Sequence, residues 1–187
     1  SLGSYLRGWG SMRIIPRRVR ALYNRVRRRL REWLLSSLNA IDARQFASYF
    51  QEALESYNVD VEGKVVVDVG ADWGSSSLYF LARGARKVIA YDRLRPRLEV
   101  RGIEWRGLWN GDYVPGDILK VDCEGCECNA DPSIFFRYET SLVAVHRFAP
   151  CYTALSGLLR EHGCSKVFTS KEGWEEVYLC KKEKKVE

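Results

Sequence analysis

The chain has 187 residues, which is enough for one α/β domain with a short extension but too few for two full domains. Hydrophobic residues make up 46% of it and charged residues 29%, so a chain too polar to form a core is excluded. No apolar run reaches the ~18 residues that span a bilayer, and the basic start shows no secretory pattern. We therefore expect a cytoplasmic protein.

The net charge of +6 is unevenly placed, because residues 1–31 contain ten Arg and no acidic residue. Within residues 17–34, apolar side chains recur at spacings of three and four, which predicts a long basic amphipathic helix. A second helix is predicted over 42–57. Residues 1–58 are thus expected to form a basic helical N-terminal extension. Its Arg-rich helix 17–34 either binds nucleic acid, an anionic membrane surface or a partner, or packs on the protein's own core.

Residues 59–187 have the pattern of an α/β domain. A β-branched strand over 65–69, a helix over 75–83 and a strand over 87–91 make one βαβ unit. A further helix is predicted over 152–162. The remaining strands are predicted at 101–105, 118–121, 142–145, 166–169 and 176–180. The alternation indicates a Rossmann-like, doubly wound and mostly parallel sheet, closed by an antiparallel hairpin of the last two strands.

The turn after the first strand has the features of an adenosine site. Glycines in a strand-to-helix turn let a ligand approach the backbone, and Asp92, at the end of the next strand, can accept hydrogen bonds from ribose hydroxyls. The predicted cofactor-binding residues lie in this turn, at the second strand end and in one later loop: Asp68, Gly70, Ala71, Asp72, Trp73, Gly74, Ser75, Asp92, Arg93 and Asp112.

The residue at position 72 indicates which adenosine-containing ligand this turn binds. A dinucleotide fingerprint has Gly where this chain has Asp72, beside the pyrophosphate seat at a helix N-terminus, and a carboxylate there would repel diphosphate. S-adenosylmethionine has no phosphate and carries an ammonium and a sulfonium, so acidic neighbours favour it. An NAD(P) site and an ordinary βα turn remain the alternatives.

Two sequence blocks also resemble a known family. Residues 68–74, Asp-Val-Gly-Ala-Asp-Trp-Gly, look like motif I of class I methyltransferases, and Asp92 matches their ribose-binding acid. Residues 116–127, Gly-Asp-Ile-Leu-Lys-Val-Asp-Cys-Glu-Gly-Cys-Glu, are similar to a block of the FkbM-type methyltransferases, which mainly methylate oxygen. The resemblance covers about residues 60–180 and implies S-adenosylmethionine as cofactor. The stretch between Asp92 and Asp122 is shorter than the family pattern.

Three side chains are predicted to be catalytic: Asp122, Glu124 and His146. Each follows a strand, so each should lie at the carboxyl edge of the sheet beside the methyl donor. Asp122 is the first choice for the base that removes a hydroxyl proton. Alternatively, Asp122 or Glu124 caps a turn or binds the methionine ammonium. His146 is a base, a metal ligand or a structural hydrogen-bonding residue.

The six cysteines give no metal assignment. Cys123, Cys126 and Cys128 lack the second C-x-x-C of a structural zinc site, so we interpret them as small buried thiols. Cys164 and Cys180 are expected near each other, by the last two strands. No metal ligand set is assigned.

Three hypotheses follow from the sequence. The first is an S-adenosylmethionine-dependent O-methyltransferase with an unidentified acceptor. The second is an RNA methyltransferase that binds the phosphate backbone through the Arg-rich helix. The third is a non-catalytic protein that binds the adenosine ligand and docks a partner through that helix.

Overall fold

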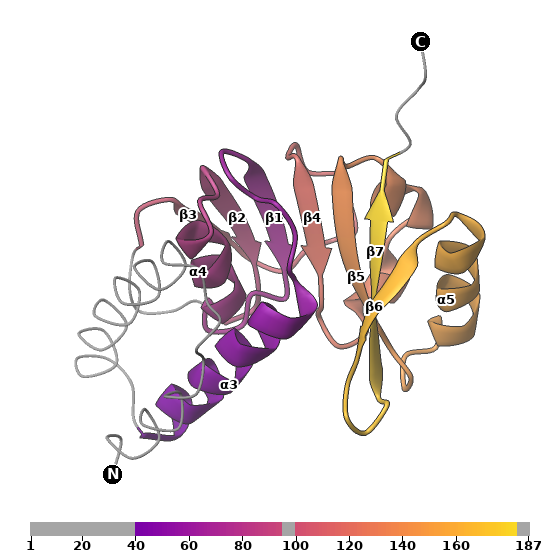
Figure 1. The fold of residues 1–187 in the computed structure, drawn as a ribbon, viewed down its shortest axis with the longest axis horizontal. Coiled ribbons are helices and arrows are strands. Elements are labelled where there is room, and N and C mark those ends of the chain that lie inside the picture. The colour runs from indigo at the N-terminus through magenta and orange to yellow at the C-terminus, as the bar shows by residue number, and fades with distance from the viewer. Residues whose placement is uncertain (1–39, 95–99, 183–187) are drawn as a thin grey trace, which may run out of the picture.

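The computed structural model describes residues 40–94 and 100–182, with side chains from Ser48 onward. The predicted Arg-rich helix 17–34 lies outside this part of the chain. Seven strands form one sheet in the order β3-β2-β1-β4-β5-β7-β6 (Figure 1). They are β1 (Val65–Val69), β2 (Lys87–Tyr91), β3 (Ile103–Arg106), β4 (Ile118–Val121), β5 (Thr140–His146), β6 (Ser165–Thr169) and β7 (Glu175–Lys181).

The sheet has the predicted Rossmann-like, doubly wound arrangement. Strands β1 to β5 pair in parallel, whereas β7 runs antiparallel to both β5 and β6. The predicted hairpin is therefore confirmed, and its second strand lies inside the sheet while β6 forms the edge. Strand β3 begins two residues later than predicted, because Arg101 and Gly102 form the turn that leads into it.

Helices cover both faces of the sheet, as the near-continuous burial of the parallel strands requires. The helices are α3 (Ala40–Ser56), α4 (Ser75–Ala82) and α5 (Tyr152–Glu161), with 3₁₀ turns η2 (Cys126–Asn129) and η3 (Pro132–Phe136). The core consists of two apolar clusters, one on each face of the sheet. On one face, alternate strand residues pack against α3 and α4, and on the other face the intervening strand residues pack against α5 and η3. None of the helices in the described ranges is long and apolar enough to cross a bilayer.

Helix α3 is part of the core, although the sequence assigned it to the N-terminal extension. Phe50 and Ala53 are buried in the same cluster as β1 and α4, and so is Tyr57, one residue beyond the helix end. The Phe50 ring packs edge-on against Tyr79 of α4, with 6.0 Å between ring centroids. The last part of residues 1–58 thus completes one face of the domain.

All six cysteines are paired, so the interpretation of Cys123, Cys126 and Cys128 as thiols is wrong. The disulfides join Cys123 to Cys126, Cys128 to Cys151 and Cys164 to Cys180. The expected proximity of Cys164 and Cys180 is confirmed. The sequence could not give the Cys128–Cys151 pair, because only the fold brings the η2 turn beside the start of α5.

The chain order of the sheet fixes where a ligand would bind. From β1 the chain moves outward to β2 and β3, and then returns to the other side of β1 as β4. Ligands in such sheets bind at the carboxyl ends of the strands where the direction reverses. The turns after β1, β4 and β5 therefore converge at one edge.

Candidate functional site

The turn after β1 lies directly against the turn after β4. Gly70 has φ +76°, and a Cβ built there would lie 1.6 Å from the carbonyl oxygen of Asp122. Only glycine permits this approach. Its N–H donates to the carbonyl of Tyr91 at 2.9 Å, so the glycine turn is also fixed to the end of β2. The predicted cofactor loop and the predicted catalytic strand end are thus in contact.

Asp72 and Asp92, two of the predicted cofactor-binding residues, lie together. The N–H of Asp72 donates to Asp92 Oδ2 at 2.9 Å, and the N–H of Leu94 donates to Asp92 Oδ1 at 2.8 Å. Each carboxylate oxygen has a second acceptor position, so these contacts orient Asp92 and still leave it able to accept from a hydroxyl.

Asp72 offers a buried acceptor to a ligand. Its Oδ2 is buried and has no hydrogen-bond partner among the described residues. Burial raises the pKa of Asp72, and the negative charges of Asp92 and Glu124 raise it further. Such an oxygen is costly to leave unpaired, and it fits a ligand that brings hydroxyls or positive charge. These residues therefore suit the ribose, ammonium and sulfonium of S-adenosylmethionine.

Asp68, which the sequence placed in the same site, is oriented inward. Its side chain is fully buried and accepts from the hydroxyls of Ser76 and Ser77 at 2.7 and 2.6 Å. The ammonium of Lys120 lies 3.1 Å from its other oxygen and also donates to the carbonyl of Gly70 at 2.7 Å. Asp68 and Lys120 thus support the glycine turn from beneath, and Asp68 is not available to a ligand.

The other predicted cofactor residues surround this turn. Gly74, with φ +95°, precedes α4. Ala71 and Ser75 are buried, Trp73 is half-buried and Arg93 is exposed. Asp112 is exposed and its carboxylate accepts from the side chain of Asn110. Contact of any of these residues with a cofactor stays a prediction.

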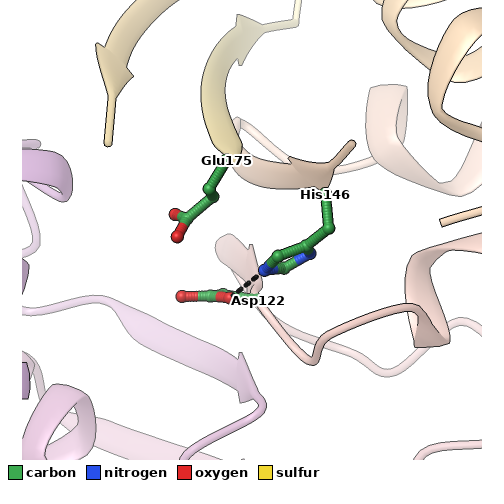
Figure 2. Close-up of side chains that lie close together, drawn as sticks. All are labelled: Asp122, His146 and Glu175. Carbon is green, nitrogen blue, oxygen red and sulfur yellow. Dashed lines mark ion pairs between the residues drawn. The ribbon is translucent and has the colours of Figure 1, made fainter. Parts of the chain in front are cut away.

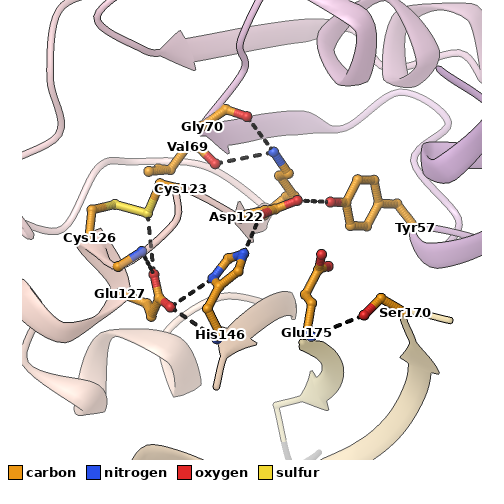
Figure 3. Close-up of polar contacts among 12 residues, drawn as sticks. Tyr57, Val69, Gly70, Asp122, Cys123, Cys126, Glu127, His146, Ser170 and Glu175 are labelled. Carbon is orange, nitrogen blue, oxygen red and sulfur yellow. Dashed lines mark hydrogen bonds and ion pairs between the residues drawn. A yellow bond between two sulfur atoms is a disulfide. The ribbon is translucent and has the colours of Figure 1, made fainter. Parts of the chain in front are cut away.

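The second part of the site is a cluster of polar side chains around Asp122 (Figure 3). Asp122 Oδ2 accepts from the buried hydroxyl of Tyr57, which follows α3. Its Oδ1 lies 3.4 Å from Nε2 of His146, at the end of β5. Two of the three predicted catalytic residues, Asp122 and His146, are therefore brought together.

Glu124, the third predicted catalytic residue, is exposed and has a left-handed backbone conformation with φ +53°. It influences the pKa of Asp72 rather than joining Asp122 and His146. The structure thus places it on the cofactor-loop side of the turn after β4.

Sequence reasoning missed two acidic residues of the cluster. Glu127 Oε1 lies 2.9 Å from Nδ1 of His146, and its other oxygen accepts from the N–H of Gly125 at 2.8 Å. Glu175, the first residue of β7, is the register partner of His146 across the β5–β7 pair. Glu127 belonged to the block that resembles the FkbM family, but only the antiparallel pairing could have identified Glu175.

The charges of the cluster are strongly coupled. Burial would raise the pKa of Asp122, but the hydrogen bond with His146 and the charge of Lys120 lower it to about 2. Burial would lower the pKa of His146, but its bonds to Asp122 and Glu127 raise it to about 10. Burial, together with the charges of Asp122 and Glu52, raises the pKa of Glu175 to about 8. At neutral pH His146 is therefore a cation between the carboxylates of Asp122 and Glu127.

The Rossmann-like fold is one that class I methyltransferases share, and their cofactor is S-adenosylmethionine. A model of FtsJ-like methyltransferases matches residues 47–112, from α3 through the glycine turn and Asp92 to Asp112. That model is not the FkbM type, so the narrower FkbM assignment remains a proposal.

The chain belongs to the family of uncharacterized protein 65 of the Sulfolobus islandicus filamentous virus (isolate Iceland/Hveragerdi). The two are 37% identical over 145 residues, which cover 71% of this chain and 90% of that protein.

Solved structures share the fold at low identity. A Lactococcus lactis protein assigned as a hemolysin superposes with a TM-score of 0.52 and 14% identity, over 71% of this chain and 85% of its own. A Plasmodium falciparum protein assigned as a ribosomal RNA methyltransferase also gives a TM-score of 0.52 and 14% identity, over 74% of this chain and 96% of its own. At such identity these likenesses show the fold alone.

Proposed function

We propose that this protein is an S-adenosylmethionine-dependent methyltransferase that methylates an oxygen of its acceptor. One observation carries the proposal: the glycine turn, within the FtsJ-like match, abuts the Asp122 end of β4. Cofactor site and reactive side chains are thereby adjacent, as methyl transfer requires.

The residues of the two subsites divide the work. Asp92 and Asp72 hold the hydroxyls and the positive charge of the cofactor, which supplies an electrophilic methyl group on sulfur. An acceptor hydroxyl at the Asp122 edge would lose its proton to a carboxylate of the cluster. The Tyr57 hydroxyl and His146 fix the orientation of Asp122 at this edge. The FkbM resemblance favours oxygen as the methylated atom.

The first test is calorimetric titration with S-adenosylmethionine and, separately, NADH. We expect wild type to bind S-adenosylmethionine alone, and Asp92→Ala to lose at least tenfold in affinity. The matched control is Asp60→Ala, an exposed aspartate that accepts a hydrogen bond from the N–H of Glu62 in its own turn. Binding of NADH, or of neither ligand, would refute the cofactor assignment. Tight binding without methyl release to any acceptor would instead favour the non-catalytic hypothesis.

RNA is the acceptor that the surface favours. Phe148 and Trp174 are 60% and 58% exposed, unusually so for aromatic residues. They flank His146 and Glu175 in sequence, and the N–H of Arg147 donates to the carbonyl of Trp174 at 2.8 Å. Exposed aromatic rings beside an Arg are typical of surfaces on which unpaired bases stack. The Arg-rich segment 17–34 would add phosphate contacts.

Replacing both rings tests the RNA acceptor. The double variant Phe148→Ala/Trp174→Ala should bind single-stranded RNA at least tenfold more weakly, since stacking contributes about 1–3 kcal/mol per base. Its affinity for S-adenosylmethionine should not change. Leu108→Ala, which removes an exposed apolar side chain elsewhere, is the control. Unchanged RNA affinity, measured by fluorescence anisotropy, would rule out this stacking surface.

A further inference from the structure

Three side chains with metal-binding atoms meet at the edge of the sheet (Figure 2). Asp122 follows β4, His146 ends β5 and Glu175 begins β7. One ligand atom from each lies within 4.8 Å of the others. The parallel β4–β5 pair and the antiparallel β5–β7 pair fix their relative positions, so the cluster is built on the rigid sheet rather than on mobile loops.

The orientation of His146 is that of a metal ligand. Its Nδ1 lies 2.9 Å from Oε1 of Glu127, whose side chain is fully buried. Nε2 therefore faces Asp122 and Glu175, as Figure 3 shows. A carboxylate behind the distal nitrogen of a histidine is the usual support of a metal-bound imidazole, because it fixes the ring and increases its basicity.

The cluster also has more acidic than basic side chains. Asp122, Glu127 and Glu175 lie around one histidine, and Glu52 of α3 interacts electrostatically with Asp122. The nearby Lys120 is already paired with Asp68 at 3.1 Å. Oε1 of Glu175 is buried and has no hydrogen-bond partner within the described part of the chain. An oxygen in that position needs a donor or a cation.

We propose that Asp122, His146 and Glu175 bind a divalent cation, with Glu127 as the residue that orients His146. Two carboxylates and one imidazole suit an ion that accepts both oxygen and nitrogen, such as Mn²⁺, better than Mg²⁺, which prefers oxygen alone. The cation takes the place of the proton on His146 Nε2, because both use the same lone pair.

Three protein ligands leave coordination positions open on the acceptor side of the sheet edge. If the proposed methyltransferase function holds, the cation positions the acceptor hydroxyl there. A Glu175 that binds through one oxygen keeps the other free to accept the hydroxyl proton. Cation binding itself does not depend on that function.

Mn²⁺ binding to the full-length protein tests the site. After chelator treatment and dialysis, loss of the free Mn²⁺ signal in electron paramagnetic resonance measures bound ion. We expect one ion per wild-type chain, at least tenfold weaker binding in Glu175→Gln and Asp122→Asn, and about 10–100-fold weaker binding in Glu127→Gln. The control Glu172→Gln changes an exposed glutamate three residues before Glu175 and should bind as wild type.

Circular dichroism confirms that each variant is folded. The proposal is overturned if folded wild type binds neither Mn²⁺ nor Zn²⁺, or if Glu175→Gln and Asp122→Asn bind as tightly as wild type. Titration of the same samples with S-adenosylmethionine separates this outcome from failure of the proposed function. Cofactor binding by a folded wild type that binds neither Mn²⁺ nor Zn²⁺ would overturn the cation site and leave the methyltransferase assignment standing.

Discussion

Lys120 is a charged residue in the centre of a buried strand. It is 1% exposed, lies 3.1 Å from the fully buried Asp68, and donates to the carbonyls of Val69 and Gly70. Because Asp68 has no access to water, removing the ammonium leaves a buried carboxylate without its counter-charge.

Lys120→Met should therefore lower the free energy of unfolding by about 3–5 kcal/mol. Replacing both partners, as Asp68→Asn/Lys120→Met, should recover part of this loss because no lone charge remains. Urea denaturation of the two variants provides the measurement. If the single variant were as stable as wild type, the ion pair would not be what supports the glycine turn.

Tyr57 acts on Asp122 through one hydroxyl. In Tyr57→Phe the ring stays in the core while Asp122 loses a hydrogen-bond donor. A hydrogen bond to a charged group contributes about 1.5–3 kcal/mol, so we expect kcat/KM for methyl transfer to fall at least tenfold while the Kd for S-adenosylmethionine stays constant. Tyr113→Phe, which changes a partly exposed tyrosine, is the control. An unaltered kcat/KM would show that orienting Asp122 is not needed.

At the scale of elements, the disulfides differ in what they join. Cys128–Cys151 links the η2 turn to the start of α5 across 23 residues, whereas Cys123–Cys126 closes a turn of three. Longer loops lose more entropy when closed in the unfolded chain.

Replacing Cys128 and Cys151 by serine should destabilise the protein by about 3 kcal/mol, and the same change at Cys123 and Cys126 by about half as much. Thermal unfolding of the two double variants would test the order. The reverse order would mean that native contacts around the η2 turn, rather than loop closure, determine the effect.

At the scale of the whole molecule, the positive charge is concentrated at one end of the chain. If the Arg-rich segment 17–34 binds RNA, the logarithm of affinity should fall linearly with the logarithm of salt concentration. Each phosphate contact in single-stranded RNA contributes about 0.7 to the slope. Replacing four residues with glutamine, Arg25, Arg27, Arg28 and Arg29, should lower the slope by up to about 3. An unchanged slope would assign the phosphate contacts to another surface.

Much of the fold could be predicted because its signals are local. The β-branched run before Gly70, the strand that ends at Asp92 and the helix closed before Gly163 each show their type within about ten residues. Buried parallel strands need apolar residues on both faces, so the doubly wound architecture followed from these segments. Asp92, Asp122 and His146 were selected for the same reason, since each lies at the carboxyl end of a strand, and their roles stay predictions.

The tertiary structure decided what depends on contacts between distant segments. The position of β7 between β5 and β6 places Glu175 opposite His146, and no local pattern marks that partner. The fold also turns Asp68 inward onto Lys120, brings Tyr57 to Asp122 and pairs Cys128 with Cys151. The sequence by itself determined the elements and the edge where the candidate site lies, because the end of a strand is marked by its neighbouring residues alone. Which side chains face one another there depends on strand order and register, which only the packed sheet defines.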